Sequence, residues 1–221
     1  MIALQLEQVG HCYGKRRIFE QVRFSLEQGD VLACVGRNGS GKSTLLRIIA
    51  GLLSPSVGTV ALLCDGIAST AAEWRRLHSG YCAPAVALYD ELTVDELARF
   101  HAACRGIEPT ALSALLEESG LADASFTCIG ELSSGMVQRL KLALAFAGSP
   151  ALIILDEPST NLDQRGIATL QKWIERARKD AIIIIATNLE TELPWCNCRY
   201  DLEARTFSHA WSNARALADH E

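Results

Sequence analysis

The stretch VLACVGRNGSGKST, residues 31–44, decides the fold. Val31 to Val35 is a continuous apolar run, as expected for a strand that is buried on both faces of a sheet. A glycine-rich loop follows, and then a helical stripe of apolar residues over 45–49. Because strand, loop and helix follow one another directly, this segment predicts one unit of a parallel sheet covered by helices.

The loop matches GxxxxGK[ST] at every fixed position. Its glycines let backbone N–H groups point inward as an anion nest, and the next helix adds the positive end of its dipole. Lys42 can then reach the β- and γ-phosphates, and Ser43 can ligate Mg²⁺. The alternative, a glycine-rich turn without a ligand, is disfavoured by this strand-to-helix context. The residues expected to bind the nucleotide are Gly36, Arg37, Asn38, Gly39, Ser40, Gly41, Lys42, Ser43 and Thr44.

Other periodic segments extend this pattern along the chain. Alternating apolar residues in the first thirty positions predict antiparallel strands, and 59–63 predicts another strand. Thr93 and Glu96 form a capping box at the start of a helix that ends before Gly106, and a second helix is expected over 109–120. Apolar strands at 151–155 and 181–186 enclose a helix over 163–179, and only short edge strands are expected after Trp195.

These elements predict an α/β fold with a mostly parallel core sheet, an antiparallel β subdomain and an inserted α-helical subdomain. We expect one domain over 1–221. Residues 1–84 and 149–221 would form the nucleotide-binding core with the antiparallel β subdomain, and residues 85–148 the helical subdomain.

Composition limits the possible partners and compartments. The formal net charge is -5 with dispersed basic residues, which argues against general attachment to nucleic acid or acidic lipid. The eight cysteines are expected to be reduced thiols that fill core space. No apolar run approaches the ~20 residues of a membrane span, and the N-terminus lacks a secretory signal. We therefore expect a cytoplasmic chain that meets a membrane only through a partner.

Two carboxylates follow the apolar run 152–155 at the edge where such sheets bind ligands. Asp156 would hold Mg²⁺ through water, and Glu157 would polarise the attacking water as a general base. Taken alone, an Asp-Glu pair is more typical of a solvated strand end; its position downstream of the glycine loop favours the catalytic interpretation.

A second anion site is predicted where residues 132–136 (LSSGM) open an amphipathic helix. The hydroxyls of Ser133 and Ser134 and the N–H of Gly135 lie at its N-terminus. The alternative is a serine N-cap without a ligand.

Together, these three motifs resemble the ABC ATPase family over nearly the whole chain. The resemblance implies a P-loop NTPase (RecA-like) fold with ATP and Mg²⁺ as ligands. It equates residues 36–44 with Walker A, 132–136 with the signature and 156–157 with the end of Walker B. Residues 159–163, including Asp163, resemble the D-loop, and Tyr13 matches the aromatic residue that stacks on adenine.

The resemblance also implies partners. Two cassettes, as a homodimer or a heterodimer, would bind head to tail with each ATP between the Walker A loop of one and the signature of the other. Transmembrane permease subunits would contact the helical insert and the loop near Pro84.

The chain departs from the family at three places. Ser134 and Met136 replace a glycine and the glutamine of the usual LSGGQ signature, and Pro84 stands where a glutamine senses the γ-phosphate. Asn188 occupies the position of the switch histidine; its amide can bond a phosphate oxygen but carries no charge. We expect slow hydrolysis at the chain's own site, with Glu157, Lys42 and Asn188 as its catalytic residues.

The predicted function is that of an ATP-binding and hydrolysing subunit that energises transport through separate transmembrane subunits. An exporter of the short-cassette type is favoured, since no regulatory domain follows the last strand. One alternative is a catalytically weak regulatory cassette paired with a more active one. Others are a soluble ABC ATPase of translation or DNA repair, and a small-molecule kinase, which would explain residues 36–43 but not Ser133 or Glu157.

Overall fold

A six-stranded sheet forms the centre of the molecule, in the strand order β10-β9-β3-β8-β7-β6. The computed structural model describes residues 1–209. Strands β6, β7, β8, β3 and β9 are parallel, and only β10 at the edge runs antiparallel. The strands are β3 (Val31–Val35), β6 (Ser79–Cys82), β7 (Leu152–Asp156), β8 (Ile182–Ala186), β9 (Cys198–Asp201) and β10 (Thr206–Ser208). The predicted α/β class is confirmed.

The three central strands are buried along their whole length, because helices or a second sheet cover both faces. In β3, Val31, Ala33 and Val35 pack into the core formed with helices α3 to α6. The alternate residues Leu32 and Cys34 pack into the opposite core, with α1 and the second sheet. This period of two explains why the run has no polar residue.

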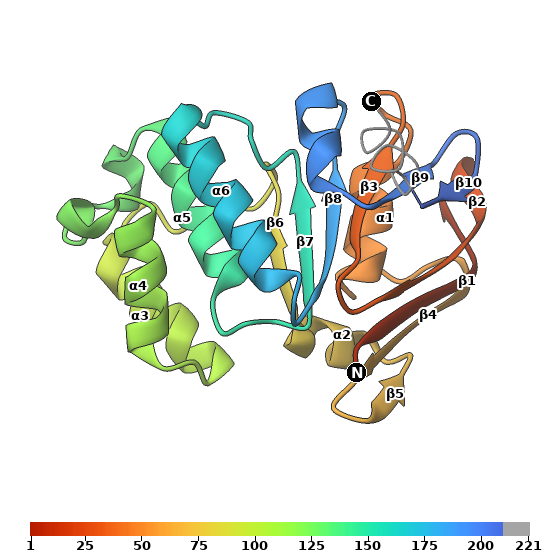
Figure 1. Cartoon of the computed structure of the whole chain (residues 1–221), viewed down its shortest axis with the longest axis horizontal. Helices are drawn as coiled ribbons and strands as arrows, with labels where there is room; N and C mark the ends of the chain where they lie inside the picture. Colours follow the sequence, from red (N-terminus) through yellow and green to blue (C-terminus); the bar gives the residue numbers. More distant parts are fainter. Residues whose placement is uncertain (210–221) are drawn as a thin grey trace, which may run out of the picture.

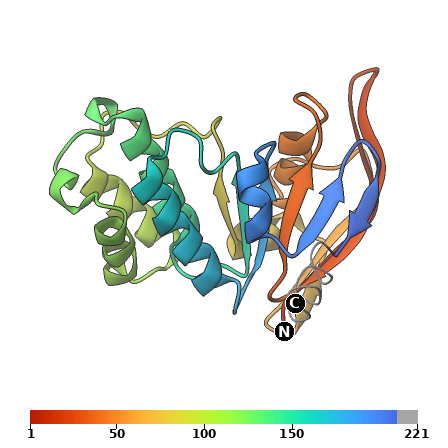
Figure 2. The same cartoon turned by 45° about the horizontal axis from the view of Figure 1, so that its top comes forward.

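The helices lie on both sides of this sheet (Figures 1 and 2). Their bounds are α1 (Lys42–Ile49), α2 (Ala72–His78), α3 (Val94–Arg105), α4 (Pro109–Glu118), α5 (Ser134–Phe146) and α6 (Gln164–Ala177). Three short 3₁₀ segments are η1 (Ala122–Ala124), η2 (Ile129–Glu131) and η3 (Glu190–Trp195). The capping box of Thr93 and Glu96 is present, and Gly106 ends α3 with a left-handed φ of 62°.

A second, antiparallel sheet has the order β2-β1-β4-β5. Its strands are β1 (Ala3–Tyr13), β2 (Arg16–Glu27), β4 (Val57–Cys64) and β5 (Ile67–Ser69). The alternating burial of β1 and β2 matches the alternating sequence, and the predicted antiparallel strands are confirmed.

The helices α3, α4 and α5 form a group at one side of the core sheet, at the left of Figure 1. Two contacts of Glu118 at the end of α4 attach this group to α6. Glu118 forms an ion pair with Arg176 at 2.9 Å and accepts a hydrogen bond from the Trp173 indole. The division of the chain into a nucleotide-binding core and a helical subdomain, with boundaries at residues 84 and 149, stays a prediction. The predicted end of the core at residue 221 lies outside the described residues.

Sequence reasoning missed β5, α2 and β6. The four residues of β6 include Gly80, where an added Cβ would come within 1.7 Å of the Ala145 carbonyl oxygen. Glycine is therefore required by close packing of α5 on this strand, although in a sequence it indicates a turn.

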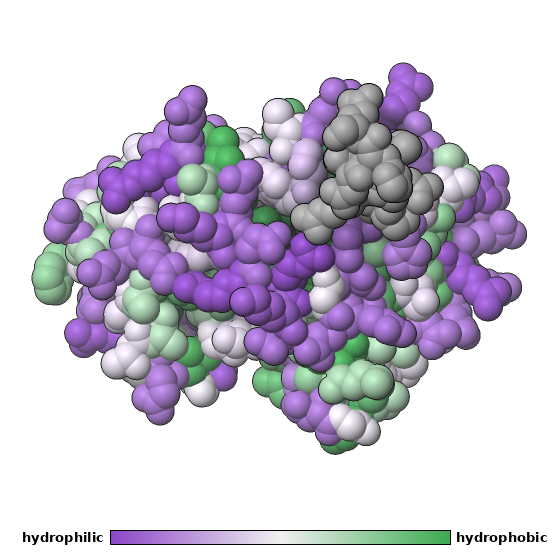
Figure 3. Space-filling model, in the orientation of Figure 1, coloured by the Kyte–Doolittle hydropathy of each residue, from purple (hydrophilic) through white to green (hydrophobic). Residues whose placement is uncertain are grey.

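All eight cysteines are free, as predicted. Cys12 and Cys104 are exposed, however, so the expectation that the thiols fill the core is wrong for these two. Across residues 1–209, every helix is too short or too polar to cross a bilayer. Figure 3 shows one face of the molecule as mostly hydrophilic, with small hydrophobic areas scattered over it.

Candidate functional site

The glycine loop 36–41 connects β3 to α1, which begins at Lys42. Gly39 and Gly41 have φ of 81° and 106°, values that favour glycine. A Cβ at Gly41 would also lie 2.5 Å from the Ile18 side chain. The loop thus has the backbone conformation that the motif requires, immediately before the N-terminus of a helix.

Lys42 folds back over this loop. Its Nζ donates hydrogen bonds to the carbonyl oxygens of Gly36 at 2.6 Å and Arg37 at 3.1 Å, and the residue is 6% exposed. The two carbonyl oxygens therefore hold the ammonium group beside the glycine loop, and phosphate oxygens bound in the loop can replace them as hydrogen-bond acceptors.

Asp156 ends β7 at the carboxyl edge of the sheet, beside Ser43 at the start of α1. Burial raises the pKa of the Asp156 carboxyl, which is 4% exposed, while a hydrogen bond from the Ser43 side chain and the charge of Lys42 oppose the shift. The structure therefore brings together the two residues predicted to ligate a metal ion.

Glu157 differs from its neighbour in both burial and backbone. It is exposed and has a left-handed φ of 49°, which is uncommon outside glycine. Its N–H donates to the Ala186 carbonyl oxygen at 2.9 Å, so the end of β8 holds this turn. The carboxylate of Asp156 is therefore buried, whereas the adjacent carboxylate of Glu157 is exposed to solvent.

Asn188 follows the end of β8, and its side-chain amide donates a hydrogen bond to the side-chain oxygen of Asn38 in the glycine loop. The predicted switch position and the glycine loop therefore meet directly.

Ser133 caps α5, with its Oγ accepting a hydrogen bond from the Met136 N–H at 3.3 Å. Ser133 and Ser134 are exposed. Within residues 1–209, no hydrogen bond or ion pair joins positions 133–135 to the glycine loop, and Figure 1 shows β7 and β8 between α5 and α1. One chain alone does not unite the two predicted anion sites.

Within residues 1–209, no hydrogen bond or ion pair joins the side chain of Tyr13 or Asp163 to the glycine loop. Tyr13 is 48% exposed at the end of β1 and packs edge-on against His11. Asp163 caps α6, since its Oδ1 accepts the Gly166 N–H at 2.7 Å. The capping bond gives Asp163 a structural role in the described chain.

Two buried polar residues that sequence reasoning missed connect these segments. Gln138 of α5 donates to the Pro158 carbonyl oxygen at 2.9 Å, one residue after Glu157. Glu192 of η3 accepts hydrogen bonds from the N–H and hydroxyl of Ser159. Gln138 could have been identified from the sequence, because it is a polar residue on the apolar face of a predicted helix. Glu192 could not, because it belongs to no periodic segment.

Pro84 is exposed, and its carbonyl oxygen accepts a hydrogen bond from Lys141 Nζ of α5 at 3.2 Å. The loop at the sensor position is therefore attached to the helix that begins at the signature.

Comparisons with known proteins identify the family of this chain. The sequence model of the ABC transporter family matches residues 19–160. The lantibiotic transport ATP-binding protein SrtF of Streptococcus pyogenes is 31% identical over 86% of this chain and 82% of its own length. The zinc import ATP-binding protein ZnuC of Roseobacter denitrificans is 35% identical over 80% of this chain and 66% of its own.

Solved structures give the same result. The ATP-binding subunit of an ABC transporter superposes with a TM-score of 0.85 and 27% identity, over 97% of this chain and 93% of that one. The dimeric cassette MJ0796, solved in a post-hydrolysis state with ADP and Pi, has a TM-score of 0.80 at 21% identity and shares the fold. The chain therefore belongs to the ABC transporter family, and its fold is the ATP-binding cassette of that family.

Proposed function

We propose that this chain binds and hydrolyses ATP as the energising subunit of a membrane transporter. The observation that carries this proposal is the convergence of Lys42, Ser43 and Asp156 at one edge of the sheet, with Glu157 next to them. The glycine loop and the α1 N-terminus receive the phosphates, and the Lys42 ammonium turns from its two carbonyls to the β- and γ-phosphate oxygens.

The environments of the two carboxylates assign their roles. Asp156 and Ser43 offer the oxygen ligands that suit Mg²⁺, which, when bound, neutralises charge on the β- and γ-phosphates. Glu157, exposed at a turn held by β8, accepts a proton from the attacking water. Asn188 donates its amide to the γ-phosphate in place of a charged side chain, which supports slow turnover.

The second half of the site comes from another copy of the chain. Residues 36–44 surround one side of a triphosphate, and the exposed Ser133 and Ser134 offer hydroxyls at the N-terminus of α5. A homodimer with twofold symmetry would contain two identical, complete sites. Gln138 and Glu192 would transmit closure, because they tie the region after Glu157 to α5 and to η3.

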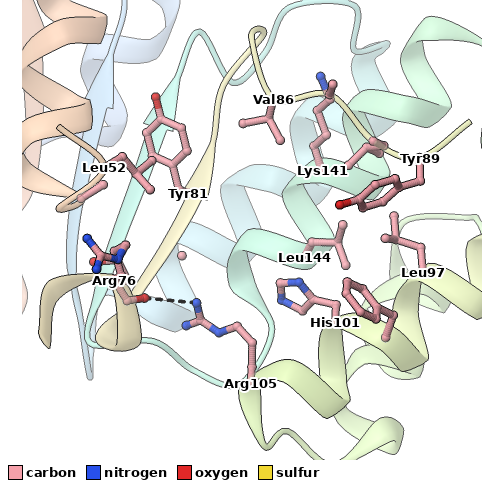
Figure 4. Close-up of a pocket in the computed structure, with 16 residues that line it drawn as sticks. Leu52, Arg76, Tyr81, Val86, Tyr89, Leu97, His101, Arg105, Lys141 and Leu144 are labelled. Atoms are coloured by element: carbon pink, nitrogen blue, oxygen red, sulfur yellow. Dashed lines mark hydrogen bonds between the residues drawn. The ribbon is translucent and has the colours of Figure 1, made fainter. Parts of the chain in front are cut away.

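The membrane partner docks in a cavity of about 400 Å³ between α2 and β6 on one side and α3 and α5 on the other. Tyr81, Tyr89 and Leu144 give it apolar walls, and Arg76, Arg105 and Lys141 also line it (Figure 4). Phe100 is a further apolar lining residue. Tyr89 and Phe100 are 60% and 54% exposed and contact each other edge-on.

We infer that the occupant is a short amphipathic helix with an acidic residue from a transmembrane subunit. Three cations line the apolar groove: Arg76 is paired with Glu73 at 2.9 Å, whereas Arg105 and Lys141 donate hydrogen bonds to backbone carbonyls and keep their charge available to an acid. The buried Nε2 of His101 has no hydrogen-bond partner within residues 1–209. Lys141 links the cavity to Pro84, and through α5 to Ser133. The chain would therefore lie on the cytoplasmic face of the cell membrane, with membrane contact only through this partner and none with nucleic acid.

The proposal is tested with the purified full chain. ATP hydrolysis should depend on Lys42 and Glu157, so that Lys42→Ala abolishes nucleotide binding while the exposed Lys15→Ala leaves it intact. Pull-down from detergent-solubilised membranes, followed by mass spectrometry, should identify a membrane-embedded companion. Association with ribosomes or DNA instead would refute the transport role.

A further inference from the structure

We propose that Cys64, Asp65 and His78 form a binding site for a divalent transition-metal ion of the zinc class. One sulfur, one carboxylate oxygen and one imidazole nitrogen of these residues all lie within 4.8 Å of one another. Zinc bonds of ~2.3 Å to sulfur and ~2.0 Å to nitrogen or oxygen place tetrahedral ligand atoms about 3.3–3.6 Å apart. His78 Nε2 and Asp65 Oδ2 are already 3.8 Å apart, so small side-chain movements close the site.

A tight hairpin fixes two of the three ligands. Cys64 ends β4 and pairs with Ile67 of β5 across the two-residue turn Asp65-Gly66. Both turn residues have left-handed φ, 53° and 76°, as a type I′ turn requires. The hairpin therefore holds the Cys64 thiol in the interior, 5% exposed, and the Asp65 carboxylate at the surface.

His78 is oriented independently of the hairpin. Its Nδ1 lies 2.8 Å from the Trp74 carbonyl oxygen, one turn earlier in α2. A carbonyl only accepts, so Nδ1 carries the hydrogen and the lone pair of Nε2 is free to face Asp65. The Trp74 ring packs on the imidazole at 4.0 Å between centroids. This backbone contact on the second ring nitrogen is the arrangement that orients histidines at metal centres.

The donor set selects the ion. Thiolate and imidazole with one carboxylate suit Zn²⁺, whereas Mg²⁺ and Ca²⁺ prefer oxygen alone. On binding, the Cys64 thiol proton leaves to solvent and a sulfur–metal bond replaces the S–H bond. The three residues line a cavity of about 310 Å³, which leaves room for water as the fourth ligand.

The site lies apart from the nucleotide. His78 immediately precedes β6, so it is at the amino end of the parallel strands, whereas Asp156 is at the carboxyl end. The hairpin and α2 lie together at the lower edge of Figure 1. Arg105 of α3 donates to the Leu77 carbonyl oxygen at 3.1 Å. A bound ion would thus fix α2 between the hairpin and the helical group.

Cobalt is the spectroscopic probe for this site. The untagged, nucleotide-free full chain, stripped with a chelator and kept reduced with a phosphine, is titrated with Co²⁺. We expect one equivalent to bind with a sulfur-to-cobalt charge-transfer band and intense visible bands of tetrahedral geometry, both removed by Zn²⁺. Zn²⁺ should also raise the melting temperature of this protein.

Variants assign the ligands. Cys64→Ser should lose the charge-transfer band, and His78→Gln should weaken Co²⁺ binding at least about 10-fold. Cys104→Ser removes an exposed thiol elsewhere and should keep both the band and the affinity. Should Cys64→Ser fail to fold, His78→Gln and Asp65→Asn decide the matter. Absence of a sulfur band in the parent protein, or its persistence at full affinity in these variants, would overturn the proposal.

Discussion

The side-chain amide of Asn188 is hydrogen-bonded to the side chain of Asn38, although the two residues are 150 positions apart. One belongs to the loop after β8 and the other to the glycine loop between β3 and α1. Both segments would touch the γ-phosphate, so this bond sets the position of the switch residue before ATP binds. The pair therefore connects Asn188, which stands at the position of the switch histidine, to the glycine loop, which matches its motif at every fixed position.

Asn188→Ala should lower kcat about 5-fold, the effect expected from one lost hydrogen bond of ~1 kcal/mol to the γ-phosphate. Asn188→His should raise kcat above that of the parent, because an imidazole can carry charge. Steady-state hydrolysis assays measure both. An unchanged kcat in Asn188→Ala would exclude Asn188 from the reaction, and Gln171→Ala, which removes an exposed amide on α6, serves as the control.

Asp156→Asn should stabilise the nucleotide-free protein near neutral pH. Burial raises the pKa of Asp156 above its ordinary value of 3.8, so the folded state binds this proton more tightly than the unfolded state does. The ionised carboxylate therefore lowers stability above the raised pKa, and this cost disappears as the pH falls toward 3.8.

Urea unfolding at a series of pH values measures this difference. Removing the charge should increase the free energy of unfolding near pH 7, by an amount in the range of ~0.5–2 kcal/mol that single stabilising substitutions commonly give. The gain should vanish at acid pH, and a variant at an exposed position, Asp180→Asn, controls for the loss of one surface charge. A less stable Asp156→Asn protein at neutral pH would contradict the argument.

The docking cavity predicts a contrast between two exposed phenylalanines. Phe100 lies at the cavity, whereas Phe126 is 87% exposed and lies away from it. Phe100→Glu should reduce recovery of the membrane companion at least about 10-fold, because it places an acid where we expect an acidic partner helix and removes an apolar contact. Phe126→Glu should recover the companion normally. Equal recovery with both variants would remove the cavity from the interface.

The core of this fold could be predicted because its signals are local. Three apolar runs indicate strands of a sheet that is covered on both faces: Val31–Val35, residues 152–155 and residues 182–186. Thr93 and Glu96 meet within one helical turn. By contrast, β6 has four residues with a glycine at its centre, and its strand character depends on pairing with β7 some seventy positions later. Local periodicity does not contain that information.

The residues of the candidate site also fall into two groups, those that the sequence identifies and those that only tertiary structure reveals. Lys42, Ser43, Asp156 and Glu157 were identified because the motif fixes their types and spacing. The contacts of Gln138 with Pro158 and of Glu192 with Ser159 depend on how α5 and η3 pack on the sheet. Such pairs become visible only when the tertiary structure is known.

ATP bound between two copies of this cassette is the central claim, and the mass of the Glu157→Gln variant tests it most directly. Size-exclusion chromatography with light scattering, in saturating ATP and Mg²⁺, should give twice the chain mass of 24.0 kDa. Ser133→Arg in the same background should stay at the single-chain mass while retaining ATP. A Glu157→Gln protein that holds ATP stoichiometrically and remains at 24.0 kDa would contradict the account.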